Sequence, residues 1–69
     1  MMQKVTKIVV DDEPAVEVDI RIWPDSTFIL RFGPGLDVTF HADRVEDGVA
    51  RCRVLEGRET LRKLREAAA

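Results

Sequence analysis

Apolar and polar residues alternate strictly along Val16–Ile22, where the sequence reads VEVDIRI. This period of two is typical of a strand that buries one face and exposes the other. The same alternation returns twice further along the chain. It places Phe28, Leu30 and Phe32 on one face of a second segment, and Leu36, Val38 and Phe40 on one face of a third.

Turn-forming residues separate these three segments. Residues 24–26 read PDS and residues 33–35 read GPG. Proline fixes its own backbone and lacks a donor for a ladder, while aspartate, serine and glycine favour turns. Hairpins closed by these loops set Ile20 opposite Leu30 and Leu30 opposite Val38. We therefore expect consecutive strands to pair antiparallel.

The stretch around residues 42–48 has two interpretations, a hairpin loop or a short helical turn. A hairpin with a two-residue Asp47-Gly48 turn would set Arg44 directly opposite Arg51, and such like-charge pairs cost free energy. A three-residue loop over 46–48 pairs Asp43 with Arg51 instead, so we expect that loop, with the helical turn as the alternative.

The spacing of apolar residues changes near the C-terminus, where Leu61, Leu64 and Ala68 follow a helical period. A helix of about three turns is unstable alone and must pack on the sheet. The sequence therefore predicts one small domain over 1–69 with a mainly β (α+β) fold. Its expected elements are a five-stranded antiparallel meander with strands at 4–10, 16–23, 27–32, 36–45 and 49–55, and one C-terminal helix at 58–68.

The apolar face of this sheet is too large for one short helix to cover. An open sheet would expose more apolar surface than soluble monomers usually do. We therefore expect either a curled sheet or small barrel, or a homodimer that covers the face.

Composition excludes several classes of protein. The chain has 69 residues, of which 45% are hydrophobic and 35% charged, and it has one cysteine and a net charge of -2. It is too short for two cores, too hydrophobic for disorder, and lacks an apolar run that could span a membrane. The N-terminal residues do not resemble a secretory signal, and a lone cysteine fits a reducing compartment, so we expect a cytoplasmic protein.

Specific catalytic and metal-binding motifs are absent from the sequence, which predicts a non-enzymatic protein without a cofactor or metal. His41 is the only histidine and is expected on the surface, whereas Cys52 is expected to be a small buried residue. The acidic residues 11–13 are expected to form a solvated loop, with a protein contact or a hard cation as alternatives.

The predicted meander gathers one group of residues typical of a binding surface. It sets Trp23, Thr27, His41 and Arg53 in one row across the outer face, with Arg21 in the next row. Exposed tryptophan beside arginine is common in protein-binding hot spots. The alternative is that Trp23 folds over the end of the sheet and covers the core.

The sequence thus predicts a small protein-interaction module that acts as an accessory, regulatory or inhibitor protein. Another protein would bind at Trp23, Arg21, His41 and Arg53, or along the edge of the first or last strand.

Two other functions stay open. The first is a nucleic-acid-binding regulator, which is less favoured because the chain is acidic overall. It would use the basic residues Arg51, Arg53, Arg58, Arg62, Lys63 and Arg65, although intervening glutamates weaken their field. The second is a structural subunit of a larger assembly.

Overall fold

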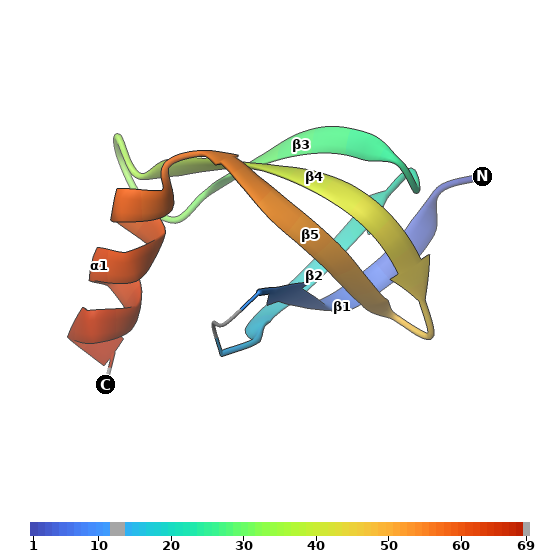
Figure 1. Ribbon diagram of the computed structural model, residues 1–69, viewed down its shortest axis with the longest axis horizontal. Helices are drawn as coiled ribbons and strands as arrows, with labels where there is room; N and C mark the ends of the chain where they lie inside the picture. The colour runs from blue at the N-terminus through green and yellow to red at the C-terminus, as the bar shows by residue number, and fades with distance from the viewer. Residues whose placement is uncertain (12–13, 69) are drawn as a thin grey trace.

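The computed structural model describes residues 1–11 and 14–68 and contains five strands and one helix (Figure 1). Each element lies within one residue of its predicted range at both ends. The elements are β1 (Gln3–Val10), β2 (Val16–Ile22), β3 (Ser26–Arg31), β4 (Asp37–Glu46), β5 (Val49–Glu56) and α1 (Arg58–Ala68). The mainly β fold with a C-terminal helix is therefore confirmed. Residues 12 and 13 of the acidic loop, and residue 69, lie outside the described residues.

The order of the strands differs from the predicted meander. The sheet runs β2-β1-β5-β4-β3, and β1 pairs with β5 in parallel, so the sheet is mixed. The β2–β3 pairing expected from the first hairpin does not form. The hydrophobic pattern specifies which side chains face the core, but any neighbouring strand can satisfy that requirement. The two edges of the sheet are consequently β2 and β3, and not the first and last strands.

The tip of the β4–β5 hairpin holds β5 against β1. The carbonyl of Gly48 accepts hydrogen bonds from the backbone N–H groups of Thr6, at 2.8 Å, and Lys7, at 3.3 Å. The β1–β2 register shifts between Val5 and Lys7, where Thr6 of β1 lies opposite two residues of β2, Val18 and Asp19. The extra residue therefore belongs to β2, and this bulge lies across β1 from the contact with Gly48.

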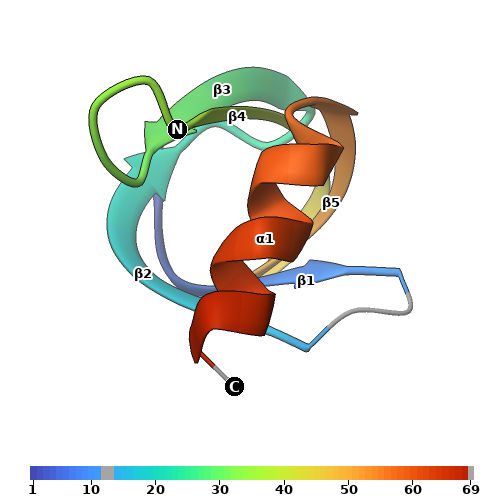
Figure 2. The same ribbon diagram turned by 90° about the vertical axis from the view of Figure 1, so that its left-hand side faces the viewer.

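The sheet curls into a half-barrel, which confirms the expected curvature (Figure 2). Its concave side holds the core, where the rings of Phe28 and Phe40 stack with centroids 5.4 Å apart. The helix lies across one open end of the half-barrel and buries Leu61. Among the described residues, the buried hydrophobic side chains are Val5, Ile8, Val10, Ile22, Val38, Phe40, Ala42, Ala50, Cys52 and Leu61.

The stretch 42–48 forms a hairpin and not a helical turn. The expected three-residue loop is wrong, because Glu46 pairs with Val49 and only Asp47 and Gly48 form the turn. Both turn residues have positive φ, 53° and 77°, as the two-residue hairpin turn with the favoured twist requires.

The two-residue turn does set Arg44 opposite Arg51. Repulsion within this like-charge pair was the reason to expect a three-residue loop. Arg44 donates a 2.7 Å hydrogen bond to Glu46, which supplies a neighbouring negative charge. A register shift between Ala42 and Arg44 then makes Asp43 the extra residue of β4. The expected pairing of Asp43 with Arg51 is therefore absent.

Candidate interaction surface

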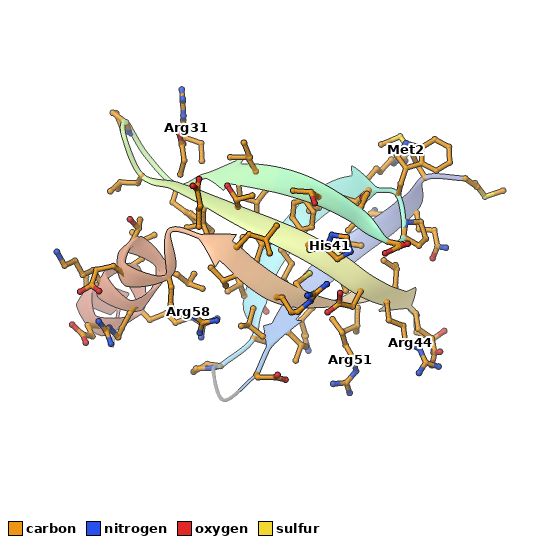
Figure 3. The ribbon with its side chains drawn as sticks, turned by 45° about the horizontal axis from the view of Figure 1, so that its top comes forward. Met2, Arg31, His41, Arg44, Arg51 and Arg58 are labelled. Carbon is orange, nitrogen blue, oxygen red and sulfur yellow. The ribbon has the colours of Figure 1, made fainter. Side chains whose placement is uncertain are left out.

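Strands β3, β4 and β5 place three of the expected residues side by side on the outer face of the half-barrel. Thr27 pairs with His41, and His41 pairs with Arg53, in adjacent ladders. The row therefore crosses three strands as predicted, with His41 at its centre (Figure 3). We call Thr27, His41, Arg53, Asp25 and Asp43 the outer polar network.

Hydrogen bonds at both ring nitrogens fix the orientation of His41. Its Nε2 lies 3.0 Å from Oδ1 of Asp25, and its Nδ1 lies 3.1 Å from Oγ1 of Thr27. The His41 side chain is 20% exposed, whereas that of Asp25 is 88% exposed. Asp25 belongs to the β2–β3 turn and has a positive φ of 56°, a conformation that aspartate tolerates better than most residues. The turn thus brings a carboxylate over His41 in the middle of β4.

Asp43 links this histidine to Arg53. The Nε atom of Arg53 lies 2.9 Å and 3.0 Å from the two carboxylate oxygens of Asp43, and its Nη2 lies 2.8 Å from Oδ1. The hydrogen bond from Arg53 lowers the pKa of the Asp43 carboxyl, and the same bond raises the pKa of Arg53. Asp43 Oδ1 also lies 3.7 Å from His41 Nε2. The network is therefore continuous from the turn to β5.

Exposed apolar side chains accompany this network. Ile29 of β3 is 64% exposed and Leu55 of β5 is 50% exposed, and Thr39 of β4 pairs with Ile29. Ile29 lies two residues along β3 from Thr27, and Leu55 lies two residues along β5 from Arg53. The outer face of β3–β5 therefore combines a fixed polar network with two exposed aliphatic side chains.

Strand pairing does not place the other two predicted protein-binding residues in this row. Arg21 belongs to β2 and pairs with Lys4 of β1, so it is not beside Ile29 as the meander implied. Trp23 follows the end of β2 and is 52% exposed, so it lies outside the core. Its carbonyl accepts a hydrogen bond from the Ser26 hydroxyl across the turn.

Sequence reasoning missed the roles of Asp25 and Asp43. The turn sequence PDS favours an aspartate that tolerates unusual backbone angles, which was a usable signal for Asp25. No comparable signal marks Asp43, because its contact with Arg53 depends on the irregularity in β4.

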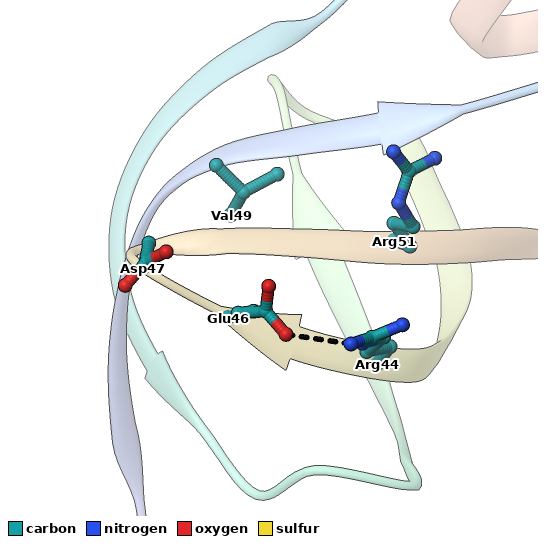
Figure 4. Close-up of a pocket in the computed structure, with 5 residues that line it drawn as sticks. All are labelled: Arg44, Glu46, Asp47, Val49 and Arg51. Atoms are coloured by element: carbon teal, nitrogen blue, oxygen red, sulfur yellow. Dashed lines mark hydrogen bonds and ion pairs between the residues drawn. The ribbon is translucent and has the colours of Figure 1, made fainter.

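The six basic residues of the nucleic-acid alternative do not share one environment. Arg53 and Arg62 are bound to Asp43 and Glu59 respectively. Arg51 is exposed and borders a hollow of about 340 Å³ at the β4–β5 hairpin, together with Arg44 and acidic Glu46 and Asp47 (Figure 4). The remaining members, Arg58, Lys63 and Arg65, lie on α1, where Arg58 and Lys63 are exposed and Arg65 is half-buried.

Cys52 is buried in the core, as expected, and burial raises the pKa of its thiol to about 11. Within residues 1–11 and 14–68, no group of three histidine, cysteine, aspartate or glutamate residues is arranged to hold a metal ion. In the same part of the chain, no helix has the length and apolar character needed to cross a membrane.

Comparisons of the chain with protein-family models, curated proteins and solved structures found no match.

Proposed function

We propose that this chain is a small non-enzymatic protein-interaction module of the cytoplasm, with an accessory, regulatory or inhibitory role. The binding surface is the outer face of β3–β5. One observation carries the proposal: the outer polar network is fixed by its own hydrogen bonds and lies beside the exposed side chains of Ile29 and Leu55.

A fixed polar surface favours binding because its side chains lose little conformational freedom when a partner arrives. His41, Thr27 and Arg53 already hold defined positions across three strands. Their hydrogen-bond partners are supplied by the chain itself, which reduces the cost of removing water from charged groups at an interface.

The aliphatic side chains supply the complementary part of the surface. Ile29 on β3 and Leu55 on β5 are exposed on the two strands that flank β4, where burial by a partner would stabilise the complex. Interfaces typically combine a few well-packed apolar anchors with surrounding polar groups. This surface has that composition.

The experiment compares proteins retained from an extract of the source cells by the immobilised chain and by an Ile29→Thr, Leu55→Thr double variant. Both substitutions keep a side chain suited to strands and alter only exposed positions. A bound partner should be depleted at least tenfold, since loss of each apolar anchor costs about 1 kcal/mol or more. The thermal midpoint should be nearly unchanged.

The matched control is Glu66→Gln, which alters an exposed residue on α1, away from the outer face of β3–β5. It should retain the same proteins as the wild-type chain. If the double variant also retains them in equal amounts, the proposed binding surface is wrong.

A further inference from the structure

A second surface lies at the helix end of the half-barrel, away from the outer polar network. The start of β2, the residue after β3 and α1 surround a groove of about 400 Å³. Its lining is mainly apolar and includes Ala15, Val16, Phe32, Leu61 and Leu64, with Arg65 on the helix side.

The groove lies between the start of one edge strand, β2, and the end of the other, β3. Because β2 and β3 are the edges of the sheet, each has one side with no strand paired to it. Five of their inward-facing apolar side chains are only half-buried, whereas most of those on the central strands are fully buried. The half-buried set is Val16, Val18 and Ile20 on β2 and Phe28 and Leu30 on β3. Apolar surface of this kind marks an interaction site.

The elements on the two sides of the groove carry opposite charge. On α1, Arg58, Arg62 and Arg65 recur at helical spacing and therefore share one side of the helix, where Arg62 also pairs with Glu59. On β2, the exposed residues Glu17 and Asp19 alternate with Val16 and Val18, so they point to the outer side of this edge strand and flank the apolar lining without being part of it. The only basic residue of β2 is Arg21, at its far end.

We propose that a second copy of this chain binds at this groove. In a two-fold symmetric contact, the same surface of both copies meets itself, so each residue contact occurs twice. The basic side of α1 in one copy would face the acidic side of β2 in the other, and the reverse. The apolar linings would cover each other. Opposite charges would then face each other in both halves of the contact, which favours association of two identical copies.

The size of the surface limits the strength of this dimer. The cross-section of the molecule normal to its long axis is 21 Å by 18 Å. That is about 380 Å² in projection, below the roughly 800 Å² per partner that stable interfaces bury. We therefore expect a weak dimer that dissociates at low protein concentration, and it leaves the outer face of β3–β5 accessible.

The first test measures solution mass by light scattering from about 1 µM to 1 mM, a range wide enough to detect a weak dimer. The mass should rise from monomer towards dimer. Leu64→Glu places a charge in the groove and should abolish the rise, while Leu55→Glu on the outer face should leave it unchanged. A monomer at every concentration overturns the proposal, and so does a dimer equally affected by both substitutions.

The second test does not depend on altering the groove lining. One variant carries Arg58→Glu and Arg62→Glu on the helix, and the other carries Glu17→Lys and Asp19→Lys on β2. Each variant alone should dimerise at least tenfold more weakly than wild type, because like charges then meet twice. An equimolar mixture should recover dimerisation, since both contacts become oppositely charged again.

Circular dichroism of each variant checks that the fold is kept. Folded variants whose mixture stays monomeric would overturn the proposed arrangement of the two copies.

Discussion

At the scale of single residues, burial determines what the one thiol of this chain can do. Cys52 lies in the core between Ala42 of β4 and Val10 of β1, its paired neighbours in the sheet. Removal from water disfavours the thiolate, and the nearby Asp43 carboxylate disfavours it further, which raises the pKa to about 11. The thiol is therefore a packing group and a poor nucleophile.

This environment predicts slow modification of Cys52 by a thiol reagent at pH 8. The raised pKa alone should lower the thiolate fraction, and hence the rate, by about a hundredfold relative to the unfolded chain. Burial should slow the reaction further. The measurement compares labelling rates in buffer and in denaturant, and similar rates in both would show that the thiol is accessible in the folded protein.

The binding row illustrates what a sequence can predict about single residues. Thr27, His41 and Arg53 meet because the β3–β4 and β4–β5 pairings follow from alternation and loop lengths. Trp23 and Arg21 were assigned through a β2–β3 pairing that does not form. The predicted position of a residue is therefore correct only where the hairpin used to predict it forms.

At the scale of elements, the junction between β5 and α1 depends on one glycine. Gly57 has a φ of 90°, and its carbonyl accepts the first helical hydrogen bond, from Leu61 N–H at 2.9 Å. A Cβ atom at this position would lie 2.6 Å from the carbonyl oxygen of Asp37 and 3.0 Å from Cα of Val38. The close approach of two backbones positions the helix over the end of β4.

Gly57→Ala should therefore destabilise the protein more than Gly35→Ala. Gly35 also has a positive φ, 73°, but a Cβ there would meet nothing within 4 Å. We expect a loss of about 1 kcal/mol for Gly35→Ala from backbone strain, and about 3 kcal/mol for Gly57→Ala from strain and displacement of the helix. Urea unfolding measures both, and equal losses would contradict the close approach.

The sequence predicts the boundaries of the strands and the helix better than it predicts the length of the β4–β5 turn. Alternation and turn residues marked each strand end, because they reflect local chemistry. Repulsion between Arg44 and Arg51 favours a three-residue loop over 46–48. In the structure, the ion pair of Arg44 with Glu46 and the extra residue Asp43 in β4 accompany the two-residue turn. The charges that surround a turn depend on the tertiary structure, so residue spacing alone does not predict them.

At the scale of the whole molecule, the parallel β1–β5 pairing determines where the groove lies. It makes β2 and β3 the sheet edges, which leaves the groove beside α1 open. The outer face of β3, β4 and β5 depends instead on the β3–β4 and β4–β5 hairpins.

Backbone NOEs between strands in solution test this topology most directly. The half-barrel predicts NOEs linking Ile8, Val9 and Val10 of β1 to Ala50, Arg51 and Cys52 of β5, in the parallel register. It also predicts none between Ile20 and Leu30, because β2 and β3 do not pair. Strong backbone NOEs between Ile20 and Leu30, with none between β1 and β5, would establish the meander instead and remove the basis for the groove.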